Sequence, residues 1–131
     1  TVFCKKENIL EIILSLHRSY KYLQRESQNC CEVNNLNFNG LLVLLEIKKG
    51  FKKKIEIANK VYLKKQNLNL ILKDLEYKKI LTNTNKQIII TELGLELLEK
   101  TTNRINEKVI KIFQKTDPKN MAGFINIIES L

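Results

Sequence analysis

The stretch from Ile57 to Thr91 constrains the fold most, because its periodicity changes from helix to strand within a single run of residues. IANKV places Ile57, Ala58 and Val61 at helical spacing, and YLKK then leaves room only for a tight turn. KQNLNLILKDLEYKK repeats the helical pattern. The β-branched run ILTNTNKQIIIT follows, and its asparagines predict a hairpin around Asn83–Lys86, because asparagine tolerates left-handed turn conformations. Helix, turn, helix and hairpin predict a winged helix-turn-helix.

Further helical patterns flank this stretch on both sides. They are predicted from Lys6 to about Ser27, within LNFNGLLVLLEIKKG, from Thr91 to about Lys115, and within MAGFINIIESL. Asn37 and Asp117 are expected N-caps, and Gly50 an expected C-cap. The 131 residues contain only four glycines and one proline, too few turn formers for a large sheet. We therefore expect one domain, 1–131, mainly α with a small β-hairpin wing and with terminal helices around the winged helix.

The positive charge is concentrated in the same region. Twelve lysines and three acidic residues lie between Lys48 and Lys86, so this segment holds the whole formal net charge of +9. The rest of the chain holds eleven cations and eleven anions and is neutral. A solvated lysine-rich surface is the simpler interpretation, but compositional bias alone should spread lysine evenly. The distribution favours a polyanion-binding face, and nucleic acid rather than a membrane.

The second helix of the pair predicts how nucleic acid would be read. Leucines at helical spacing are expected to anchor one side of it, while Lys65, Asn69 and Lys73 share the other side, with Gln66 beside them. Glutamine and asparagine bond adenine through N6 and N7, and lysine contacts phosphate or guanine. We expect Gln66 and Asn69 to read bases. The full set of predicted DNA-binding residues is Lys54, Lys64, Lys65, Gln66, Asn67, Asn69, Lys73 and Lys86.

The sequence resembles the multiple-antibiotic-resistance regulator (MarR-type) family of winged-helix repressors at four places in order. LNFNGLLVLLEI is similar to the family pattern Leu-Thr-x-x-Gln-hydrophobic-x-Val-Leu, with Asn37 for threonine and Gly40 for glutamine. IANKV matches the Leu-Ala pattern, LEYKKIL the Leu-Glu-x-x-Gly pattern, and ITELGLELLEK the Leu-Thr-x-x-Gly pattern, with Gly94 in place. The motifs cover roughly residues 36–99. The resemblance implies a winged helix that binds DNA as a dimer.

Two departures from the family pattern concern the wing. Lys79 stands where the family has glycine, and no Asp-x-Arg element lies between Leu81 and Thr91. Wing contacts would therefore fall to Lys86 and the asparagines. The short wing also resembles small winged-helix plasmid partition proteins.

Dimerisation is expected for two reasons besides the resemblance. One helix-turn-helix gives a small interface, and two-fold dimers read two half-sites about one helical turn apart. The wide apolar stripes of residues 5–27 and 100–131 could supply the dimer surface, or they could close a core within one chain. The sequence thus predicts a homodimeric, sequence-specific binder of double-stranded DNA at an A/T-rich palindromic site, with residues 36–99 as the DNA-binding part. A transcriptional repressor is expected; a plasmid or phage partition or replication-control protein, or a protein–protein assembly module, is the alternative.

The remaining residues give no support for catalysis or a cofactor. Cys4, Cys30 and Cys31 lack a Cys-x-x-Cys spacing and are expected to be small thiols in loops or on the surface. With no glycine-rich phosphate loop and no nucleophile–base set, we expect no enzyme activity, no cofactor and no metal. Apolar runs are shorter than the roughly 20 residues of a membrane span, so a cytoplasmic location with no membrane partner is expected.

Overall fold

The computed structural model describes residues 6–84, 87–115 and 117–131, which form six helices and one two-stranded antiparallel sheet. The elements in chain order are α1 Lys6–Glu32, α2 Phe38–Lys48, α3 Lys54–Val61, α4 Lys65–Tyr77, β1 Leu81–Thr84, β2 Gln87–Ile90, α5 Glu92–Phe113 and α6 Pro118–Glu129. The predicted order of helix, helix, helix-turn-helix, hairpin and two further helices is confirmed.

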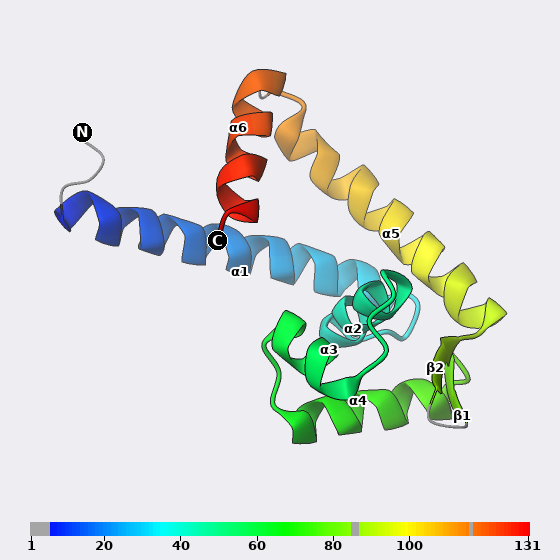
Figure 1. The fold of residues 1–131 in the computed structure, drawn as a ribbon. Helices are drawn as coiled ribbons and strands as arrows, with labels where there is room; N and C mark the ends of the chain where they lie inside the picture. The colour runs from blue at the N-terminus through cyan, green and yellow to red at the C-terminus, as the bar shows by residue number, and fades with distance from the viewer. Residues whose placement is uncertain (1–5, 85–86, 116) are drawn as a thin grey trace.

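The molecule consists of a compact body and two long helical arms (Figure 1). The body is made of α2, α3, α4 and the hairpin, and α4 lies along its outer edge. The arms are α1 and α5, which pack on each other near the body and diverge away from it. Beyond the far end of α5 the chain turns back as α6.

A single hydrophobic core lies inside the body, and the predicted helical stripes supply it. Each of α2, α3 and α4 contributes two or more buried residues, and the hairpin and α5 complete the core. The buried apolar side chains of this contiguous core are Cys31, Leu36, Leu41, Val43, Leu44, Ile47, Ile57, Ala58, Leu68, Leu72, Leu75, Ile80, Leu81, Ile88 and Leu98. They include the three α4 leucines that the sequence predicts to be buried, Leu68, Leu72 and Leu75.

Four helices end in the same way, with a residue of positive φ just past the helix. These residues are Asn35 (φ 54°), Gly50 (φ 109°), Tyr62 (φ 56°) and Lys79 (φ 62°). After each of them, the next backbone N–H donates to a carbonyl five residues back, as Ile80 does to Leu75 O at 2.9 Å. This is the Schellman arrangement, which satisfies the last carbonyls of a helix and turns the chain sharply. The sequence predicts it only at Gly50.

The first helix is one turn longer than predicted, and this changes the environment of two cysteines. α1 continues through Glu32, whereas the sequence predicted a loop from Gln28 onward. Cys30 and Cys31 therefore lie in the last turn of α1, where they are buried at 3% and 0% exposure. The expectation of loop or surface thiols is wrong for both, because the extra turn directs them toward α5 and the core. Cys4 lies outside the described residues.

The wing is anchored to the body by a joint between β2 and α5. Leu81 pairs with Ile90 and Thr84 with Gln87 in the antiparallel register. Thr91 is the N-cap of α5: its hydroxyl oxygen accepts from Gly94 N at 3.0 Å, and its hydroxyl donates to Ile80 O at 2.9 Å. The joint thus links the end of α4, the wing and the start of α5.

Candidate nucleic-acid interface

The helix α4 divides into a buried side and an exposed side, as the sequence predicts. Leu68, Leu72 and Leu75 are at most 3% exposed and fix the helix in the core. The centre of the opposite side is formed by Gln66, Leu70, Lys73 and Tyr77, which recur at intervals of four, three and four residues and are all exposed. Side chains on this line point away from the body and are free to contact a partner.

The predicted cationic residues that the structure describes are exposed at the surface of α3 and α4. Lys64 precedes the first turn of α4, Lys65 begins it, and Lys73 lies two turns further along; all three are exposed. Lys54 is the first residue of α3 and is exposed too. Within the described part of the chain, none of these four lysines forms an ion pair. Their charge is therefore not neutralised by the protein itself.

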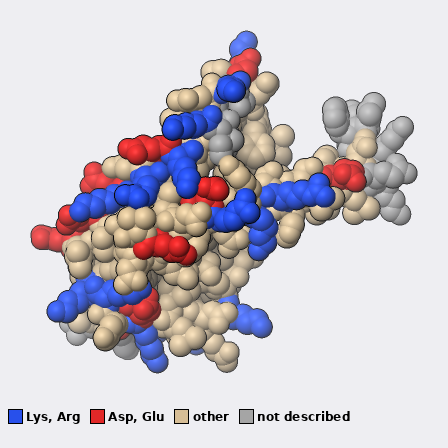
Figure 2. Space-filling model, turned by 180° about the vertical axis from the view of Figure 1, so that it is seen from behind, with Lys and Arg blue, Asp and Glu red and all other residues tan. Residues whose placement is uncertain are grey.

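Figure 2 shows how differently charge is distributed over the two ends of the molecule. On the face drawn, acidic and basic side chains alternate along the arm that contains α5, while the end that carries α4 and the wing is largely uncharged, with more basic than acidic patches. This matches the sequence, in which the stretch Lys48–Lys86 carries the whole net charge. Lys86 itself lies outside the described residues, so its predicted wing contact stays a prediction.

The predicted amide side chains have different environments. Gln66 and Asn67 are exposed in the first turn of α4. Asn69 is only half-exposed, and its side-chain oxygen is buried with no hydrogen-bond partner among the described residues. Reading adenine through both amide atoms would require the Asn69 side chain to rotate outward. A partner-less buried oxygen costs free energy, so such a rotation has a local driving force.

Two exposed apolar side chains on the same line were missed by the sequence reasoning. Leu70 is 66% exposed and Tyr77 is 88% exposed. The signal was present, since Leu70 lies four residues from Gln66 and off the stripe of Leu68, Leu72 and Leu75.

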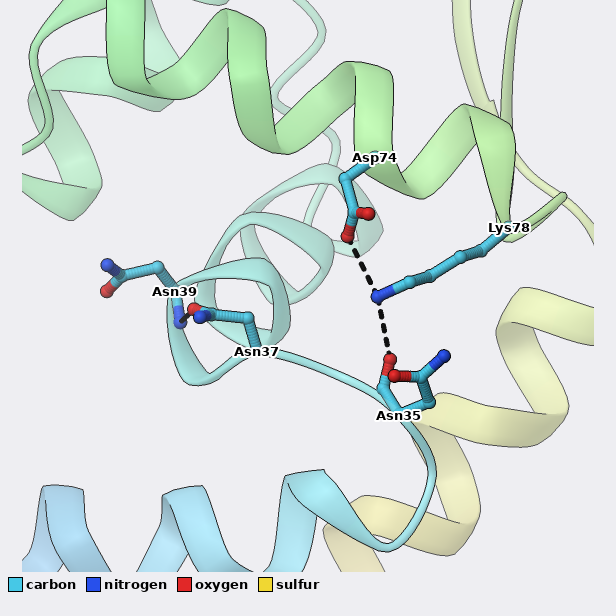
Figure 3. Close-up of polar contacts among 5 residues, drawn as sticks. All are labelled: Asn35, Asn37, Asn39, Asp74 and Lys78. Atoms are coloured by element: carbon cyan, nitrogen blue, oxygen red, sulfur yellow. Dashed lines mark hydrogen bonds and ion pairs between the residues drawn. The ribbon is translucent and has the colours of Figure 1, made fainter.

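One lysine of the basic segment has a structural rather than a binding role. The Lys78 ammonium donates to the Asn35 carbonyl oxygen at 2.8 Å and pairs with the Asp74 carboxylate at 2.9 Å (Figure 3). Asn35 belongs to the turn before α2, whose N-cap Asn37 accepts from Asn39 N at 2.8 Å. Lys78 therefore ties the end of α4 to the loop that starts α2.

The thiol of Cys31 is unreactive in character. Burial raises the pKa of Cys31 to about 11, with smaller contributions from the neighbouring Cys30 and Glu32. A thiol with so high a pKa is protonated at neutral pH, and it is the thiolate that reacts.

Together, the core-anchored α4, its basic exposed side and the adjoining hairpin define a winged helix-turn-helix protein. The chain belongs to the family described as wHTH-PRTase associated, whose model matches residues 41–119, more than half of the chain. The matched region runs from α2 into the start of α6 and contains the helix-turn-helix and the wing. Among curated proteins, none matches this chain significantly.

Several solved structures share the whole fold, including both arms. CouR from Rhodococcus jostii RHA1, bound to p-coumaroyl-CoA, has a TM-score of 0.82 at 16% identity over 91% of this chain and 89% of that one. A MarR family protein from Bacillus stearothermophilus has a TM-score of 0.79 at 11% identity, over 96% of this chain and 94% of that one. The Mycobacterium tuberculosis MarR family protein Rv2887, in complex with DNA, has a TM-score of 0.75 at 15% identity, over 89% of this chain and 94% of that one. The MarR-type resemblance in fold is confirmed.

The structure shows both positions at which the sequence departs from the family pattern. Lys79 occupies the left-handed position where the family pattern has glycine. The wing strands are four residues each, consistent with the short segment read from the sequence. None of the described helices is both long enough and apolar enough to cross a membrane.

Proposed function

We propose that this protein is a cytoplasmic DNA-binding transcription regulator that acts as a homodimer, most simply as a repressor. In this proposal α4 is the recognition helix in the major groove, residues 36–99 form the DNA-binding part, and the arms form the dimer. The observation that carries it is the division of α4, with three leucines in the core and an unpaired basic side facing solvent. A relative of the same fold is described in complex with DNA, which supports this function.

The assigned contacts follow the usual docking of a helix-turn-helix. Residues at the N-terminal end of the second helix reach base edges, and flanking cations contact phosphates. Gln66 and Asn67 would therefore face bases, and Asn69 would join them after rotating outward. The backbone contacts would come from Lys54, Lys64, Lys65, Lys73 and Lys86. Amide readers favour adenine, so the site would be rich in A·T pairs.

The dimer is proposed because the first half of α1 and the whole of α6 leave their apolar faces uncovered. The first half of α1 exposes apolar side chains at 39–66%, and α6 has no buried residue. Part of the second stripe does pack within one chain, since Ile105 lies against the core, which leaves the first half of α1 and α6 as the uncovered faces. A second copy is the occupant that fits, because a palindromic site requires two recognition helices related by a two-fold axis. The exposed residues are Ile9, Leu10, Ile12, Ile13, Leu14, Leu16, Tyr20, Phe124, Ile125, Ile127 and Ile128.

A salt titration on random-sequence duplex DNA tests DNA binding directly. The logarithm of the binding constant should fall linearly with the logarithm of the salt concentration, with a slope of about −0.9 per phosphate neutralised. Replacing Lys64, Lys65 and Lys73 together by alanine should reduce the slope by about one per lysine. The matched control removes the same charge from α5 and α6, at Lys100, Lys111 and Lys119, and should leave the slope unchanged. No binding at low salt would contradict the proposal and favour the protein-assembly alternative.

A further inference from the structure

The apolar side chain of Leu70 lies largely exposed, outside the hydrophobic core. It is 66% exposed, whereas Leu68, Leu72 and Leu75 of the same helix are at most 3% exposed. It belongs neither to the core nor to the partly buried residues packed against it. It lies on α4, whereas the uncovered apolar faces lie on α1 and α6. The proposed dimer would therefore not cover it.

The position of Leu70 on α4 is the informative observation. It lies between Gln66, four residues earlier, and Lys73, three residues later, so the three side chains lie in one row on the exposed side. Its two neighbours in the row are a hydrogen-bonding amide and a cation. Whatever Gln66 contacts, Leu70 is one helical turn further along the same surface.

The major groove offers one partner that suits such a side chain. Base edges there present hydrogen-bond donors and acceptors, which an aliphatic group cannot use, and the C5-methyl group of thymine is the apolar exception. Phosphates would be a poor partner, because an aliphatic group offers them no hydrogen bond. A Gln66 amide on adenine and an apolar group one turn away on a thymine methyl would both select A·T pairs.

We infer that Leu70 is a specificity residue that packs against the methyl group of a thymine in the recognised site. The inference rests on the proposed function, since it places α4 in the major groove. It adds a second, apolar mode of reading to the amide mode assigned to Gln66. Truncating Leu70 should therefore reduce the preference for thymine and leave the phosphate contacts of the lysines intact.

The test compares thymine with uracil, which differs only by the missing methyl group. A binding duplex is first selected from a random pool with the wild-type chain, and then resynthesised with each thymine replaced singly by deoxyuridine. Wild type should lose about fourfold in affinity for each contacted methyl group. Leu70→Ala should bind the thymine and uracil duplexes equally at that position. The control Leu95→Ala truncates a 45% exposed leucine on α5 and should keep the wild-type ratio.

The outcomes separate this inference from the proposed function. If wild type binds the selected duplex but does not distinguish thymine from uracil at any position, Leu70 does not read a methyl group and the inference is wrong. It is equally wrong if Leu70→Ala retains every thymine preference of wild type. In both cases DNA binding itself stands. If no duplex is selected even at low salt, the proposed function fails, and the inference fails with it.

Discussion

At the residue scale, two glycines in similar helical settings have opposite requirements. A Cβ on Gly94 would overlap the Ile80 carbonyl oxygen and lie 2.7 Å from Ile90 Cγ2, so the joint between the wing and α5 requires glycine. A Cβ on Gly40 would lie 3.5 Å from a Leu36 methyl and 3.7 Å from a Leu75 methyl, which are ordinary contacts. Only Gly94 is thus required by close approach.

Alanine at these two positions should therefore change stability in opposite directions. Gly94→Ala should lower the free energy of unfolding by about 3 kcal/mol, because backbone atoms must move. Gly40→Ala should raise it by about 0.5–1 kcal/mol, because glycine inside a helix is unfavourable. Urea denaturation followed by circular dichroism measures both, and a well-tolerated Gly94→Ala would show that the joint is looser than described.

Lys79 is a second residue whose backbone conformation can be tested. Its φ of 62° is left-handed, which suits glycine better than a residue with a Cβ. Lys79→Gly should raise the free energy of unfolding by about 0.5–1 kcal/mol. Lys79→Ala removes the same charge but keeps the Cβ, so it should bring no such gain. Equal effects of both variants in denaturant would assign the change to charge instead.

The raised pKa of Cys31 predicts a pH dependence of stability. The folded-state pKa is about 11, above the ordinary thiol value of 9.0, so the folded protein retains a proton that the unfolded chain releases. This contribution is fully present below pH 9 and is lost as pH rises from about 9 to about 11. The stability difference between wild type and Cys31→Ala should therefore shrink over this window. A constant difference in denaturation curves across these pH values would argue against the buried thiol as the cause.

At the element scale, the predictability of the helices depended on which interactions determine their ends. Side-chain caps were readable, since Asn37, Thr91 and Asp117 each accept a backbone N–H in the way their residue types predict. The end of α1 was not readable, because it depends on Asn35 adopting a left-handed conformation and on the burial of Cys31 against distant residues. Packing between residues that are far apart in the chain cannot be predicted from the local sequence.

The candidate site, like the helix ends, was predictable from the sequence only in part. The buried leucines of α4 and the exposure of Gln66 follow from helical period alone. The half-burial of Asn69 and the structural use of Lys78 do not, because both depend on what lies opposite them across the body.

For the recognition helix, base and phosphate contacts should separate in binding experiments. Gln66→Ala should relax the choice of sequence by about 1–3 kcal/mol at the base pair it reads. Lys54→Ala should instead weaken specific and random DNA by the same factor, because phosphate contacts carry no sequence information. Competition binding on selected and random duplexes measures both. Identical losses on the two DNAs for Gln66→Ala would remove it from the base-reading set.

At the scale of the whole molecule, the exposed arm of α1 predicts that a charge placed there separates the two chains. Ile13 is 56% exposed on that arm, and Ile13→Glu would place a carboxylate in the proposed apolar dimer interface. Sedimentation should show a dimer for wild type and a weaker dimer or a monomer for the variant. Ile89→Glu is the control, since Ile89 is 51% exposed on the wing, outside the arms. A wild type that is monomeric at all concentrations would contradict the proposed assembly.

In the proposed dimer, α6, which has no fully buried residue within its own chain, would gain most of its packing energy from the second copy. The fraction of chains with α6 packed would then rise with the concentration of the protein, because dilution dissociates the dimer by mass action. If the proposed repressor works in this way, its target genes would stay on until the chain is made above a threshold concentration. The copy number of the chain would then act as a signal, even with no small-molecule effector.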